Sequence, residues 1–173
     1  MTDKIPGAEE GRHDRGDAIL LRLKQRYDEQ QIPNRWIPPD EETPYSSLII
    51  RFDSIGEEDH MIDLELCFLP GLEEFDRVDV AILQSFAVIS DDVPSGARSA
   101  VLEEAAQINP NLVVGSFGIM QETGALYFKH NALFHLDWLA GEDGPLQIDR
   151  QNALILHQFH LFTDRLLSAA RRD

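Results

Sequence analysis

The sequence predicts an α+β domain in which a single antiparallel sheet carries helices on one face. Segments rich in β-branched and aromatic residues follow one another closely, and short polar breaks with glycine or proline separate them. Amphipathic stretches with helical spacing precede, interrupt and follow these segments. The predicted element order is α-β-β-β-α-β-β-α, and strands joined mostly by tight turns favour antiparallel pairing.

The N-terminal part divides into a polar tail and a first helix. Residues 1–16 are charged and contain scattered glycines, so we expect a mobile tail, with one domain over residues 17–173. Asp17 is the predicted N-cap, and the helix ends near Gln31, before Pro33. Its apolar stripe is formed by Ile19, Leu20, Leu23 and Tyr27.

Three strands follow a proline-rich loop that contains Trp36. We expect Trp36 either to dock on the domain or to face a partner. The strands are predicted at 45–53, 60–69 and 76–89, and the last is apolar on both faces, which favours a central position. The middle strand alternates between a core face and a solvated face. Its core residues are Ile62, Leu64, Leu66 and Phe68, and its solvated residues are Met61, Asp63, Glu65 and Cys67.

A second helix is predicted between Pro94 and Asn109, and Val101, Leu102, Ala105 and Ile108 form its apolar stripe. The stretch from Asn111 to Phe134 then predicts the hairpin beside which the other segments pack. Two strand-like runs flank a polar break that ends in Gly124, where glycine supplies the positive φ of a tight turn.

The last helix is predicted to start at Asp149 and is the most apolar. Its seam follows a seven-residue repeat through Ile155, Phe159, Phe162, Leu166 and Ala169. Leu154 and Leu161 fall outside this seam. Either this surplus is buried against a second subunit or a partner helix, or the whole helix lies inside a monomer core.

Charge and cysteine content restrict the class of protein. Thirty-one acidic against 15 basic residues give a net charge of −16, which repels nucleic acids and anionic membranes but can attract a basic partner. The acidic run at residues 57–59 either steers such a partner or forms solvated loops. Cys67 is the only cysteine, which favours a reducing compartment. Without an apolar run of ~18 residues or a secretory signal, we expect a cytoplasmic protein.

The element order and several short motifs resemble a known group of proteins. The motifs are Ala106-Gln107-Ile108-Asn109, Gly115-Ser116-Phe117 and Thr123-Gly124-Ala125-Leu126-Tyr127-Phe128, followed by an apolar terminal helix. They are similar to the type III secretion chaperone-like fold and to the related YbjN-like family of bacterial sensory transduction regulators. The resemblance implies a small acidic protein, often a homodimer, that holds a partner polypeptide.

No stretch carries a strong catalytic signature. His157, His160 and Asp164 share a helix face, and His130 and His135 could join them in a metal site, but the His-Glu-x-x-His motif is absent. The favoured interpretation is that these histidines border the apolar stripe. Asp63 and Glu65 could cooperate in acid–base catalysis, but the favoured interpretation of two acids in an acidic protein is a solvated strand face.

The sequence therefore predicts a non-enzymatic, chaperone- or adaptor-like protein that binds a partner polypeptide and forms a homodimer. No catalytic, cofactor-binding or metal-binding residue is assigned. The candidate partner-binding residues are Leu154, Leu161, Trp36, Asp63 and Glu65. The alternatives are a small-ligand or signalling regulator on the same fold and a metal-dependent enzyme that uses the histidines.

Overall fold

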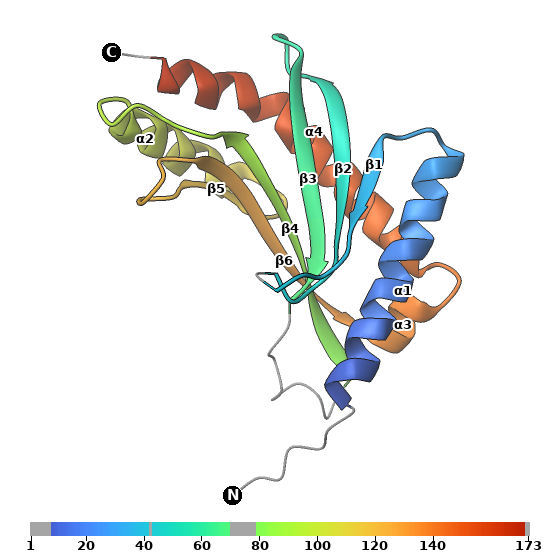
Figure 1. The fold of residues 1–173 in the computed structure, drawn as a ribbon. Coiled ribbons are helices and arrows are strands. Elements are labelled where there is room, and N and C mark those ends of the chain that lie inside the picture. The colour runs from blue at the N-terminus through green and yellow to red at the C-terminus, as the bar shows by residue number, and fades with distance from the viewer. Residues whose placement is uncertain (1–7, 42, 70–78, 172–173) are drawn as a thin grey trace, which may run out of the picture.

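The computed structural model of the chain describes residues 8–41, 43–69 and 79–171 (Figure 1). Within them lies one six-stranded antiparallel sheet in the order β1-β2-β3-β4-β6-β5, which confirms the predicted α+β class. The strands are β1 (Asn34–Ile37), β2 (Ser47–Ile55), β3 (His60–Phe68), β4 (Val80–Ser90), β5 (Ser116–Ile119) and β6 (Leu126–His135). The helices are α1 (Ala8–Glu29), α2 (Arg98–Ile108), the 3₁₀ helix η2 (Asn109–Asn111), α3 (Leu136–Ala140) and α4 (Gly144–Ala170).

The helices cover only one side of the sheet, which we call the inner face. In Figure 1, α4 runs behind β2 and β3, α1 packs at the β1 end, and α2 lies at the β5 end. Most side chains that point to the inner face are buried, and Leu64, Leu83 and Phe128 are fully buried. The opposite side of the sheet, the outer face, carries no helix among the described residues.

Three aromatic rings tie the C-terminal half of the sheet to α4. The rings of Phe128 on β6 and Phe159 on α4 meet edge to face, with centroids 5.1 Å apart, and Phe117 on β5 lies 5.3 Å from Phe128. The predicted hairpin is confirmed as β5 and β6, and Gly124 in its turn has φ +82°. Gly115 is required beside β6, because a Cβ there would collide with the ring of Phe128.

The start of α1 differs from the prediction. The helix begins at Ala8 rather than Asp17, so residues 8–16 are helical instead of a mobile tail, while residues 1–7 lie outside the described residues. Tertiary contacts explain the extension. Gly16 packs against the ring of Phe68, and the Arg15 guanidinium donates to Asp79. Asp17 lies inside the helix and accepts a hydrogen bond from the Ser46 hydroxyl.

A strand replaces part of the predicted proline-rich loop. Residues 34–37 pair with β2, and Trp36 stands opposite Leu48 and packs against the core from the inner side. The loop prediction was wrong for these residues because a four-residue strand between prolines carries too little alternation to be recognised without its partner.

The last two helices also differ from the prediction. α3 was not predicted, and α4 begins at Gly144, so Asp149 is an interior residue that pairs with Arg26 instead of an N-cap. The predicted strand at 76–89 corresponds to β4, and its residues 76–78 lie outside the described residues. Leu102 is exposed on α2 rather than part of the buried stripe. Each helix of the described chain is too short or too polar to cross a bilayer.

Replacement of Phe159 should test the contact between α4 and the sheet. We expect Phe159→Ala to lower the free energy of unfolding by about 3–5 kcal/mol, because it removes a fully buried ring and leaves a cavity. Leu161→Ala, two residues away and 52% exposed, should change it by less than ~0.5 kcal/mol. Urea denaturation measures both, and equal losses would contradict this packing.

Candidate functional site

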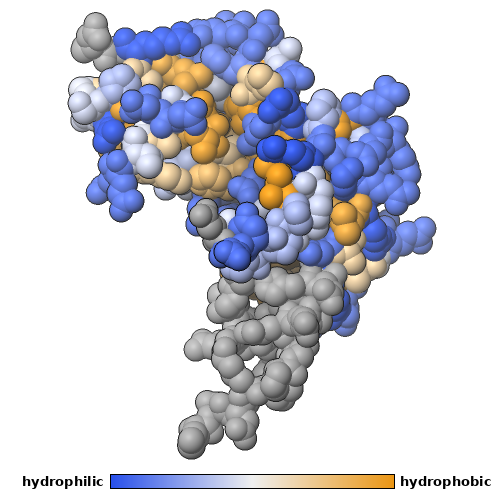
Figure 2. Space-filling view, viewed as in Figure 1, coloured by the Kyte–Doolittle hydropathy of each residue, from blue (hydrophilic) through white to orange (hydrophobic). Residues whose placement is uncertain are grey.

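The outer face of the sheet is the candidate functional site. Outward side chains of the central strands mix large apolar groups with charged groups. Met61 on β3 is 61% exposed, and Leu133 on β6 is 62% exposed. Figure 2 looks onto this face and shows hydrophobic residues gathered around the upper part of β4 and its neighbours, bordered by hydrophilic residues.

A shallow groove crosses this face from β2 to β4. Its volume is about 360 Å³, and it is lined by Ile49, Arg51, Met61, Asp63, Glu65, Phe86, Val88 and Asp91. A second depression of about 250 Å³ shares Ile49, Arg51 and Asp63 and extends to Arg35 on β1. The two depressions together form a continuous track across four strands, with apolar and charged residues side by side.

The charged groups of the groove are held by neighbours on the next strand. Arg51 donates two hydrogen bonds to Asp63, Nε to Oδ1 at 2.7 Å and Nη2 to Oδ2 at 2.8 Å. These bonds lower the pKa of Asp63 below its ordinary value. Glu65 accepts a hydrogen bond from the hydroxyl of Ser47. Both carboxylates are therefore fixed in position on the face.

An aromatic pair borders the groove on the β6 side. The rings of Phe86 and Tyr127 stack with centroids 5.7 Å apart and an interplanar angle of 24°. Tyr127 also lies over Gly118 of β5, where a Cβ would stand 2.8 Å from the phenol ring. The glycine thus allows the ring to lie flat along the outer face, and the pair forms a rigid apolar platform.

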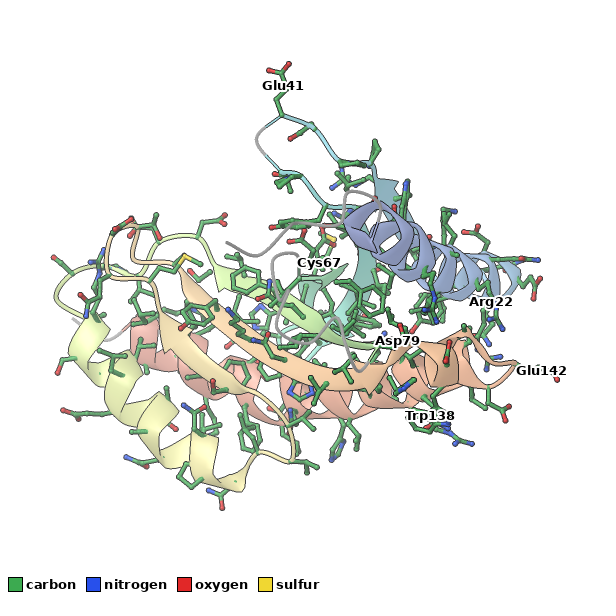
Figure 3. The ribbon with its side chains drawn as sticks, turned by 90° about the horizontal axis from the view of Figure 1, so that it is seen from below. Arg22, Glu41, Cys67, Asp79, Trp138 and Glu142 are labelled. Atoms are coloured by element: carbon green, nitrogen blue, oxygen red, sulfur yellow. The ribbon has the colours of Figure 1, made fainter. Side chains whose placement is uncertain are left out.

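Cys67, which is labelled in Figure 3, was predicted on the solvated face of β3, but the residue is only 1% exposed. Burial raises the pKa of its thiol to about 12, and the charge of Glu65 adds to this shift. Such a thiol stays protonated near neutral pH and does not act as a nucleophile. Cys67 is therefore a packing residue of the sheet.

The structure divides the predicted partner-binding residues between two sides of the molecule. Asp63 and Glu65 line the groove on the outer face. Trp36 packs against the core on the inner side, so of the two expectations for this residue the structure shows docking on the domain. Leu154 and Leu161 lie on α4, 43% and 52% exposed, on the far side of the helical layer. The five residues therefore do not form one surface.

The predicted histidine group is also divided. His160 Nδ1 accepts a hydrogen bond from the Gly56 N–H, and Asp164 accepts one from the Glu57 N–H at 2.7 Å. His60, which sequence reasoning had not included in the histidine group, places its Nε2 2.9 Å from Oδ1 of Asp164. These contacts fasten the β2–β3 turn to the end of α4, and we call them the turn clasp. His157 is exposed, while His130 and His135 lie on β6.

Two groups of side chains have ligand atoms close enough to share a cation. In each group the atoms lie within 4.8 Å of one another, and the groups are Glu58, His60 and Asp164, and Asp79, His135 and Asp137. A guanidinium already occupies carboxylate oxygens of each group and balances part of its negative charge. Arg171 pairs with Glu58 at 2.7 Å, and Arg15 pairs with both Asp79 and Asp137. These pairings give both groups a structural role in joining helices to strands.

Sequence reasoning missed most of the groove. Ile49 and Arg51 on β2 and Phe86 on β4 reach the same groove only because the strands pair in a particular register. The strict alternation of β3 placed Asp63 and Glu65 on the correct face, and the same alternation applied to β2 would have placed Ile49 and Arg51 beside them.

Searches of protein-family profiles, of curated proteins and of solved structures found no significant match to this chain. The candidate site is therefore defined by its geometry.

Asp164 should make the turn clasp pH-dependent. The pKa of Asp164 lies below its ordinary value. The main cause is the hydrogen bond from the Glu57 N–H, and the hydrogen bond with His60 adds to it. Because the folded pKa lies below the unfolded value near ~3.9, the stabilisation is complete above that value and is lost as the pH falls through the folded pKa.

We therefore expect Asp164→Asn to lower the urea midpoint at pH 7 and to match the wild type more closely at about pH 3. Asp53→Asn removes the same charge from an exposed position of β2 and serves as the control. A deficit of Asp164→Asn that stays constant across this pH range would contradict the assignment.

Proposed function

We propose that this protein is a non-enzymatic binding module that holds a segment of a partner polypeptide on the outer face of its sheet. The main support for this proposal is that helices cover only one face of the sheet. Helices bury the inner face, whereas Met61 and Val88, which line the same groove, remain exposed on the outer face. Contiguous exposed apolar groups bordered by polar residues are typical of interaction sites.

The shape of the site supports a polypeptide ligand. The track from Arg35 on β1 to Val88 on β4 is long, shallow and open, as a groove for an extended chain would be. Apolar positions such as Met61 and Phe86 can take up the partner's side chains, and the flanking carboxylates can bind its cationic groups.

The state of the carboxylates supports a binding role over acid–base catalysis. Asp63 is held by Arg51 in two hydrogen bonds, and its lowered pKa keeps it ionised at neutral pH. A general acid or base needs a pKa near the working pH. Since Arg51 already balances the charge of Asp63, Glu65 and Asp91 are the groove carboxylates left to attract and orient a positive group.

The net charge of −16 favours a basic partner. Opposite charges speed the encounter and suppress acidic competitors, and salt weakens this effect. The similarity of the motifs to chaperone-like proteins that hold partner polypeptides supports the same class of function, and assignment to that fold family is part of the proposal.

An unfolded basic polypeptide tests the proposal directly. Reduced and alkylated lysozyme, labelled for fluorescence anisotropy, should bind the wild-type protein, and the affinity should fall as salt rises from about 50 to 500 mM. Met61→Lys should weaken binding by more than ~tenfold, because it replaces an apolar contact with a positive charge.

The matched control is Leu102→Lys, which makes the same change in charge at an exposed leucine of α2, away from the outer face. It should alter the affinity by less than ~twofold. Equal losses for the two variants, or no binding by the wild type at low salt, would overturn the proposal.

A further inference from the structure

One edge of the sheet is left partly unpaired. β6 pairs with β4 along its whole length, up to His135 opposite Val80. On its other side β5 pairs only with Leu126–Lys129. The segment His130–His135 therefore has no strand on that side, and no other backbone hydrogen bond to this segment is found among the described residues. Alternate residues of the segment present free N–H and C=O groups.

The opposite edge of the sheet, unlike the β6 edge, is protected against pairing with another chain. Beyond β1, the exposed end of β2 has a register shift between Phe52 and Ile55, a positive φ at Ser54 and an acidic residue, Asp53. Such features prevent a second chain from pairing. The β6 segment keeps a regular register with β4. It contains no proline, and its two histidines are its only ionisable side chains. It lacks the usual protection of a free edge.

The segment is also complementary to itself. Its outward residues are Asn131, Leu133 and His135, and its inward residues are His130, Ala132 and Phe134. If two copies pair antiparallel with Leu133 opposite Leu133, then Ala132 of each copy lies opposite Phe134 of the other. Apolar residues then meet apolar residues on both faces, as a two-fold interface requires.

Exposed aromatic surface adjoins the edge. β6 leads directly into α3, which carries Trp138 (labelled in Figure 3). Trp138 is 60% exposed, and its ring lies 6.5 Å from that of Phe134. A second copy on the edge would approach this indole as well as Leu133. Pairing would therefore cover apolar surface in addition to joining backbone groups.

We propose that the β6 edge pairs with the same edge of a second copy of this chain, so that two sheets join into one. The occupant is a second copy because the edge is uncharged in a chain of net charge −16 and matches itself residue by residue. The pairing is separate from partner binding on the outer face. Since two like-charged chains repel, salt strengthens this association, whereas it weakens binding of a basic partner.

Light scattering at a chain concentration of about 100 μM tests the proposal. The wild type should give twice the single-chain mass of 19.6 kDa at high salt. Leu133→Lys places like charges opposite each other and should return the mass to one chain. Met61→Lys is the control, because it makes the same substitution at an equally exposed position of the outer face, on β3. It should stay dimeric although it loses the basic partner.

A monomeric wild type at high salt would overturn the proposal, as would a folded Leu133→Lys that remains dimeric or a Met61→Lys that dissociates. Amide exchange of the wild type decides the question if Leu133→Lys does not fold. Within residues 130–135, the amides that point away from β4 to the free edge should exchange more than ~tenfold more slowly at high than at low chain concentration. The exchange rates of the amides of residues 52–55 should not depend on chain concentration. Equal behaviour of the two edges would also overturn it.

Discussion

The structure depends on the burial of one side of a six-stranded sheet by a single helical layer. Inward side chains of all the long strands meet α4 and its neighbours, and the contact of Phe159 with Phe128 lies at the centre of that layer. Apolar burial is the main favourable contribution to folding, and here it is satisfied from one side. The outer face is consequently free to carry exposed apolar groups without a loss of stability.

Polar contacts keep the helical layer in place at both ends. The turn clasp joins the β2–β3 turn to α4 through Asp164 and His160. At the other end, Arg22 of α1 donates to the carbonyls of Ala140 and Gly141 in the turn that also carries Glu142 (Figure 3). Each contact links segments more than one hundred residues apart in sequence. They hold α1 and α4 on the inner side of the sheet, while the described residues place no helix on the outer face.

Periodicity predicted those parts of the molecule that depend on local sequence. The alternation of β3 placed Leu64 inside and Asp63 outside, and Gly124 marked the hairpin turn. Features that depend on distant partners were missed. β1 exists because it pairs with β2, and Cys67 is buried although its position in the alternation is outward. The groove likewise requires the register of three strands, which no single segment encodes.

If the protein works as proposed, its outer face is open in the free protein and covered when a partner polypeptide binds. Hydroxyl-radical footprinting of Met61 measures this most directly, with Met120 in the β5–β6 turn as an internal reference. We predict rapid oxidation of Met61 in the free chain and protection when unfolded basic polypeptide is added, with no change at Met120. Slow oxidation of Met61 in the free chain, or equal oxidation with and without the polypeptide, would show that the outer face is not the binding surface.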